Sequence, residues 1–159
     1  MMFERGVRFF PGSSAFRARI GSYSAFNCRV TLTTATIGRY CSIGHNTEFG
    51  LGSHNVSRIT TSSSVTNRGT FRNLVGRIPD AVIEQETLVK EETSQVTLGH
   101  DLWAGCHCLF PKSVTIGHGA VIGAGSIITH DVPPYAIVAG AGAEQIARAL
   151  LRVIAFPTR

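Results

Sequence analysis

The sequence is poor in charged side chains and contains almost no lysine. Only 16% of its 159 residues are charged, and just two residues are lysines, Lys90 and Lys112. No block of five or more basic residues occurs, although the formal net charge is +5. The arginines therefore indicate a generally basic surface, or a field that attracts an anionic cofactor or an acidic polymer. They do not favour a nucleic-acid-binding protein.

The sequence also lacks the segments that membrane insertion and secretion require. No run of 18 apolar residues is present, and no apolar segment follows a basic start as it does in a signal peptide. No Cys-x-x-Cys pair occurs among the four cysteines, which are Cys28, Cys41, Cys106 and Cys108. We therefore expect free thiols, no zinc knuckle and a cytoplasmic location.

What the sequence does contain is glycine, 17 residues in all, and a repeat of six residues. In each unit an aliphatic residue precedes a glycine or another small or turn-forming residue. A small or modest side chain follows three places after this second residue. Twelve units start at Ile20, Phe26, Leu32, Ile37, Ile43, Phe49, Leu98, Ala104, Phe110, Ile116, Ile122 and Ile128. A helix needs apolar residues every three or four positions, and a hairpin strand needs strict alternation, so neither explains this pattern.

A period of six predicts short strands joined by turns, three of which close one triangular coil. Residues eighteen apart then stack at roughly 4.8 Å. The aliphatic and small positions fill the interior, and glycine relieves the turn. The predicted fold class is all-β, a parallel β-helix that forms one domain over residues 1–159 with coils at 20–54 and 96–139.

Three segments fall outside the repeat. Residues 1–19 are expected to form an irregular basic cap at the N-terminus. Residues 55–95 break the period and are expected to form a long excursion loop, of the kind that is usually functional. Residues 143–155 are expected to form a short C-terminal α-helix that covers the open end of the coils, because apolar residues recur there every fourth position.

Two stretches resemble the hexapeptide-repeat acetyltransferases: IGRYCSIGHNTEFGLGSH and VTLGHDLWAGCHCLFPKSVTIGHGAVIGAGSIITHDVPPYAIVAG. The WAG, GAGS and DVPPYAIVAG elements arrive in the order of that family. The resemblance is strongest to the branch that contains xenobiotic acetyltransferases and surface-polysaccharide O-acetyltransferases. It implies a left-handed β-helix, a homotrimer with active sites between subunits, acetyl-CoA as cosubstrate and no metal.

His54 is the expected catalytic base. It lies in GSHN at the end of a coil, where the family has its catalytic histidine. A neutral imidazole, with an ordinary pKa of about 6.5, can take the proton of a sugar hydroxyl as the oxygen attacks a thioester. The resemblance implies direct transfer in a ternary complex, so no cysteine or serine nucleophile is required. Asn55 and Ser57 are expected to contact the acceptor, and Ser57 stands where antibiotic-modifying relatives often carry an acidic residue.

The resemblance also assigns residues to acetyl-CoA. It places Trp103 near the thiol end, Gly105 and the backbone of Ala124 along the pantetheine arm, and Thr129 beside the pyrophosphate. The family commonly has lysines where this chain has His130 and Glu144, so we expect an arginine of the C-terminal segment, Arg148 or Arg152, to meet the phosphates.

The other histidines receive structural assignments. His100 and His118 are eighteen residues apart and are expected to stack in one outer row, and the outward His107 is the next candidate for the base. The related γ-type carbonic anhydrases build a zinc site on this fold with two histidines five residues apart. That pair is missing here, so no metal is expected.

The sequence thus predicts an acetyl-CoA-dependent O-acetyltransferase that acts on a sugar hydroxyl of a surface polysaccharide or its precursor. A xenobiotic (antibiotic) acetyltransferase is the alternative. A zinc lyase and a non-catalytic β-helix scaffold also remain open.

Overall fold

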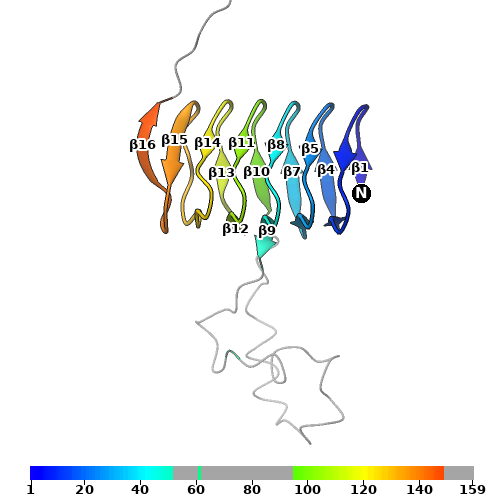
Figure 1. The fold of residues 1–159 in the computed structure, drawn as a ribbon, viewed down its shortest axis with the longest axis horizontal. Helices are drawn as coiled ribbons and strands as arrows, with labels where there is room; N and C mark the ends of the chain where they lie inside the picture. Colours follow the sequence, from blue (N-terminus) through cyan, green and yellow to red (C-terminus); the bar gives the residue numbers. More distant parts are fainter. Residues whose placement is uncertain (52–60, 62–94, 149–159) are drawn as a thin grey trace, which may run out of the picture. The chain divides into compact units, whose positions relative to one another are not determined.

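The computed structural model describes residues 1–51, 61 and 95–148 of the protein, and these residues form short strands joined by tight turns (Figure 1). The chain divides into two compact units, residues 1–51 with 94–159, and residues 52–93. Every described strand belongs to the first unit. Among the described residues no helix has the length and apolarity needed to cross a bilayer.

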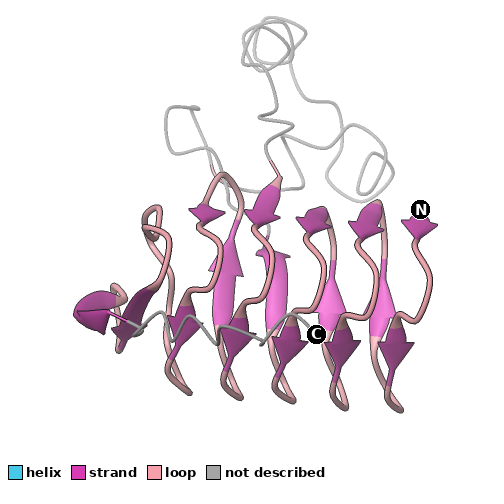
Figure 2. Cartoon of the chain, turned by 90° about the horizontal axis from the view of Figure 1, so that it is seen from above, coloured by secondary structure: helices cyan, strands magenta, loops and turns pink. Residues whose placement is uncertain are grey.

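The strands form three sheets, which are the three sides of a prism (Figure 2). Sheet A contains β1 (Met2–Phe3), β4 (Ala18–Ile20), β7 (Ala35–Ile37), β10 (Val96–Leu98) and β13 (Thr115–Ile116). Sheet B contains β2 (Arg8–Phe9), β5 (Ala25–Phe26), β8 (Ser42–Ile43), β11 (Trp103–Ala104), β14 (Val121–Ile122), β15 (Ala136–Ala139) and β16 (Glu144–Arg148). Sheet C contains β3 (Ser14–Ala15), β6 (Thr31–Leu32), β9 (Glu48–Leu51) and β12 (Leu109–Pro111).

Successive coils stack in parallel, as the six-residue repeat predicts. Leu98 pairs with Ile116, eighteen residues further on. In the N-terminal coils the spacing is seventeen, as between Ile20 and Ile37, because one unit of each coil has five residues. The predicted spacing of eighteen therefore holds only in part of the chain.

The described coils are interrupted after residue 51, and the next coil begins with β10. Strand β10 pairs directly with β7, with Leu98 opposite Ile37, so the interior continues without a break. Phe49 and Phe110, both fully buried, stack with ring centroids 4.3 Å apart across this junction. Burying a side chain of this size stabilises the fold by about 1.5–3 kcal/mol, so the junction is a strong point of the core.

Most repeat glycines, although not Gly50 with its φ of +72°, have a different role from the predicted one. Gly99 has an ordinary backbone conformation, but a Cβ on it would lie 2.7 Å from the backbone N of His118 in the next coil. Glycine is needed here because stacked coils approach closely. The left-handed φ falls two residues later, where Asp101 has φ +56°.

The expected irregular cap over residues 1–19 is wrong. Residues 2–15 carry β1, β2 and β3, which pair with the next coil and put Phe9 against Phe26 at 4.7 Å. The expected helix over residues 143–155 is wrong for residues 144–148. They form β16, which pairs antiparallel with β15 because Gly140 and Gly142, with φ near +90°, reverse the chain. Residues 149–155 and most of the 55–95 excursion lie outside the described residues.

Candidate active site

Trp103 stands on the outer face of sheet B. It begins β11, and its indole is 59% exposed. In the sheet register it lies between Ser42 on β8 and Val121 on β14. Both neighbours have short side chains, so the indole can contact a ligand that lies along the sheet.

Gly105 and Ala124 meet at the corner where sheet B turns toward sheet C. A Cβ on Gly105 would lie 2.6 Å from the backbone N of Ala124, and the Gly105 N–H donates to the Ile122 carbonyl at 2.8 Å. Gly105 is buried and Ala124 is exposed. The structure thus brings together three of the residues that the sequence assigned to acetyl-CoA, with Trp103 two residues before Gly105.

The same corner holds five polar residues in contact, which we call the corner group: Arg29, His45, Asn46, Cys106 and His107. The Cys106 Sγ lies 3.1 Å from the His45 Nδ1, and the His45 and His107 rings meet edge to face with centroids 5.3 Å apart. The Asn46 Nδ2 lies 3.3 Å from the His107 Nε2, and the Arg29 Nε donates to the Asn46 Oδ1 at 2.6 Å. His45 and Cys106 are not among the residues predicted to form the site, although each directly follows a repeat glycine.

The other residues assigned to acetyl-CoA lie further along the prism. The Thr129 Oγ1 lies 3.2 Å from the His130 Nδ1 in the last coil. Arg148 ends β16, and its neighbour Ala147 is three strands from Trp103 in the register of sheet B. That separation is roughly 14 Å at the spacing of adjacent strands. The remaining assigned residues, His54, Asn55, Ser57 and Arg152, lie outside the described part of the chain.

Comparison with known proteins finds acetyltransferases, although no protein-family model matches the chain. A chloramphenicol acetyltransferase of Klebsiella aerogenes is 31% identical over 116 residues, covering 69% of this chain and 49% of the relative. A galactoside O-acetyltransferase of Escherichia coli (strain K12) is 49% identical over 45 residues, 28% of this chain and 22% of the relative. The chain belongs to the hexapeptide-repeat acetyltransferase family.

A solved structure shows the same fold. Galactoside acetyltransferase in complex with coenzyme A has a TM-score of 0.64 at 24% identity, covering 99% of this chain and 70% of that one. The left-handed parallel β-helix expected from the sequence is thereby confirmed. The chain spans about half the length of the chloramphenicol acetyltransferases that it matches.

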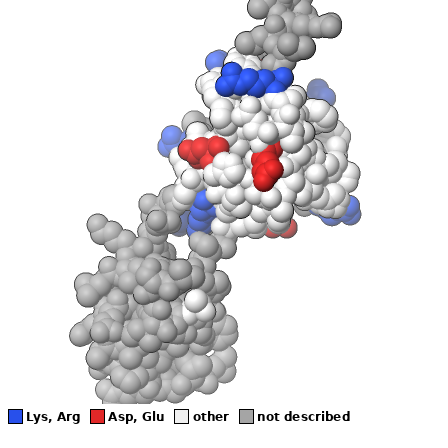
Figure 3. All heavy atoms as spheres, turned by 90° about the vertical axis from the view of Figure 1, so that its left-hand side faces the viewer, with Lys and Arg blue, Asp and Glu red and all other residues white. Residues whose placement is uncertain are grey.

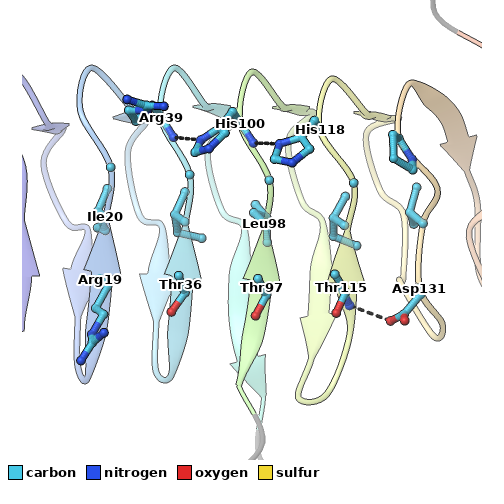
Figure 4. Close-up of a pocket in the computed structure, with 18 of the residues that line it drawn as sticks. Arg19, Ile20, Thr36, Arg39, Thr97, Leu98, His100, Thr115, His118 and Asp131 are labelled. Atoms are coloured by element: carbon cyan, nitrogen blue, oxygen red, sulfur yellow. Dashed lines mark hydrogen bonds between the residues drawn. The ribbon is translucent and has the colours of Figure 1, made fainter.

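A trough of about 810 Å³ lies on the outer face of sheet A, away from the corner of Gly105 and Ala124 (Figure 4). Several of its polar side chains hold neighbouring coils together. His118 accepts from the His100 N–H at 2.8 Å, Asp131 accepts from the Thr115 N–H at 2.7 Å, and Glu4 accepts from the Ser22 N–H at 2.9 Å. We therefore assign no chemistry to the trough.

The predicted stacking of His100 on His118 is confirmed, with ring centroids 4.9 Å apart. The expected free thiols are also confirmed, since none of the four cysteines forms a disulfide. In the described part of the chain, no three His, Cys, Asp or Glu side chains are grouped as metal ligands.

Charge is dispersed at the C-terminal end of the prism. Figure 3 shows basic and acidic side chains lying separately among neutral residues on that face. An anionic ligand there would meet single cations and not a continuous basic patch.

Proposed function

We propose that the protein is an acetyl-CoA-dependent O-acetyltransferase that acts on a sugar hydroxyl of a surface polysaccharide or its precursor. The observation that carries this proposal is the meeting of Trp103, Gly105 and Ala124 at one corner, in a chain of this family. An exposed indole beside a corner of close-packed backbone suits a slender amide chain such as pantetheine.

The donor lies along sheet B in this proposal. The thioester end is near Trp103 and the pantetheine arm passes Gly105 and Ala124. Thr129 and Arg148, both exposed, lie toward the C-terminal end of the prism, which suits the pyrophosphate and phosphate end of a long cofactor. The galactoside acetyltransferase that shares the fold was solved with coenzyme A, which supports this donor.

His54 is the proposed base, and the acetyl group passes directly from acetyl-CoA to the acceptor. The acceptor hydroxyl loses its proton to the neutral imidazole while its oxygen attacks the thioester carbonyl. The bond between the carbonyl carbon and the CoA sulfur then breaks, and the imidazolium returns the proton to that sulfur. Asn55 and Ser57 hold the acceptor. The described strand β9 ends at Leu51, three residues before His54 in the sequence.

Two acceptors have support among the relatives. The galactoside O-acetyltransferase match, 49% over 45 residues, favours a sugar. The longer chloramphenicol acetyltransferase match, 31% over 116 residues, favours an antibiotic as the second candidate. We further propose a homotrimer in which the exposed Trp103 is covered by a neighbouring subunit, and a cytoplasmic location, which suits four free thiols.

The experiment is steady-state acetyl-CoA consumption with galactosides, capsule oligosaccharides and chloramphenicol as acceptors. With the best acceptor, His54→Ala should lower turnover by about 10²–10⁴-fold and leave acetyl-CoA affinity almost unchanged. His118→Asn is the control, since it keeps an acceptor for the His100 N–H and lies outside the site. A His54→Ala enzyme that keeps most of its turnover would place the base elsewhere, with His107 next.

A further inference from the structure

Cys106 lies between two different neighbours in one row of the prism. The row runs along the corner between sheets B and C and is defined by backbone bonds from coil to coil. The Asn46 N–H donates to the Cys28 carbonyl, the His107 N–H to the His45 carbonyl, and the Gly125 N–H to the Cys106 carbonyl. Cys28, His45, Cys106 and Ala124 therefore stack in that order.

His45 is in position to act on the Cys106 thiol. Its Nδ1 lies 3.1 Å from the Cys106 Sγ, inside the range of a hydrogen bond to sulfur. The imidazole also contacts the His107 ring edge to face, the Asn46 amide contacts that ring, and Arg29 donates to Asn46. Both His45 and Cys106 are half-buried, so the pair is in contact with solvent yet held in one geometry.

The other thiols lack this arrangement. Burial raises the pKa of Cys41 and of Cys108, and both thiols donate to backbone carbonyls, at 3.3 Å in each case. Cys28 shares the row but lies two coils from Cys106. That separation is roughly 9.6 Å, beyond the reach of a disulfide. Cys106 is therefore distinguished by its base.

We propose that Cys106 accepts an acetyl group from acetyl-CoA, with His45 as the base that activates its thiol. The proposal rests on the proposed function, because Gly105 precedes Cys106 and Ala124 stacks on it, and both are assigned there to the pantetheine arm. Cys106 follows Gly105 directly and is three residues from Trp103, so its sulfur lies beside the proposed path of the donor, where the arm leads to the thioester.

The step balances without a further reagent. The Cys106 Sγ forms a bond to the acetyl carbonyl carbon while its proton passes to the His45 Nδ1. The tetrahedral intermediate collapses, the bond between that carbon and the CoA sulfur breaks, and His45 returns the proton to the CoA sulfur. One thioester replaces another, so the exchange is reversible. When no acceptor hydroxyl is present, the acetylated protein accumulates.

The test is intact-mass and peptide mass spectrometry after incubation with acetyl-CoA and no acceptor. One acetyl group is expected, on Cys106, and neutral hydroxylamine should remove it because it cleaves thioesters. Cys106→Ser should abolish the label, and Cys28→Ser, a half-buried cysteine of the same row, should leave it unchanged. His45→Gln should slow labelling by about 10²–10⁴-fold, the usual contribution of a general base. Thermal melts of each variant show that it is folded.

Two further measurements separate this proposal from the proposed function. Calorimetric titration with coenzyme A reports whether the donor binds at all. The acetyl thioester of N-acetylcysteamine carries the acyl group without the nucleotide, so it tests Cys106 independently of cofactor binding. Donor binding without a label on Cys106 from either thioester would overturn the proposal and leave the proposed function intact. Labelling of Cys28 and Cys106 at equal rates would also overturn it.

Discussion

The close approach of stacked coils predicts a large effect for one small substitution, Gly99→Ala. The new Cβ would lie 2.7 Å from the backbone N of His118, whereas ordinary contacts begin at 3.4 Å. The coils must therefore part locally by about 0.7 Å, the difference between these distances. Two of the backbone hydrogen bonds that hold them there run from the Gly99 N–H to the Ile116 carbonyl and from the Gly119 N–H to the His100 carbonyl, each 2.8 Å long. We expect a loss of about 2–4 kcal/mol, from overpacking and weakened hydrogen bonds.

Gly125→Ala is the matched control for this prediction. Gly125 has φ +73°, but nothing lies within 4 Å of a Cβ placed on it. A left-handed alanine costs about 1–2 kcal/mol, partly offset by the lower entropy of the unfolded chain. Urea unfolding followed by circular dichroism should show a lower midpoint for Gly99→Ala than for Gly125→Ala at similar slopes. If the two variants are equally stable, close coil approach is not the reason for the repeat glycines.

Three other predictions concern the core and the site. Phe110→Ala should cost about 3–5 kcal/mol in urea unfolding, because the ring is fully buried against Phe49; a loss below about 1 kcal/mol would contradict this packing. Burial raises the pKa of the Cys41 and Cys108 thiols above 9.0, so their contribution to stability is complete below that pH and is lost as pH rises through the folded pKa. The melting temperature should therefore fall more steeply from about pH 8 to 10 in the wild type than in Cys41→Ala/Cys108→Ala, and equal slopes would show that these thiols do not contribute. Trp103→Ala should raise the KM for acetyl-CoA about tenfold, some 1.4 kcal/mol, because the indole exposed on this chain is the proposed contact of the thioester end; an unchanged KM would remove Trp103 from the donor site.

The interior of the prism could be predicted from the sequence because each six-residue unit contributes two inward-pointing positions. The aliphatic residue and the small residue four places after it both point inward, as Ile37 and Cys41 show. A side chain that fits one coil must also fit the coils on either side of it. Apolar positions therefore recur in register through the whole chain, and a pattern of that length identifies the fold.

The first coil could not be predicted in the same way. Phe3, Phe9 and Ala15 keep the apolar positions, but Glu4 and Phe10 stand where later coils have glycine. Glu4 is useful there because its carboxylate accepts from the N–H and hydroxyl of Ser22, at 2.9 and 2.6 Å. A charged side chain thus holds the first coil to the second, and a search for glycine misses it.

The C-terminal segment shows how pairing overrides local periodicity. Ile146 fits a helical face with the apolar residues that follow it in the sequence, yet it lies in β16 and is exposed. Without β16, the backbone groups along the outer edge of β15 would have no strand partner, and an antiparallel strand supplies partners along that edge. The sequence predicts that the C-terminal segment covers the end of the coils. That it does so as a strand depends on the open edge of β15, to which it pairs.

One contact of the site could be predicted from the sequence, and another could not. Gly105 and Gly123 are eighteen residues apart in an unbroken run of the repeat, so the meeting of Gly105 with Ala124 follows from counting. His45 and Cys106 are 61 residues apart, a number that is not a multiple of six or eighteen, and the excursion lies between them. Their contact depends on the register in which the chain returns to the prism, with Leu98 against Ile37. A shift of that register by one residue would turn Leu98 outward and separate the thiol from its imidazole. The buried packing of this junction therefore also fixes the geometry on which the proposed chemistry of Cys106 depends.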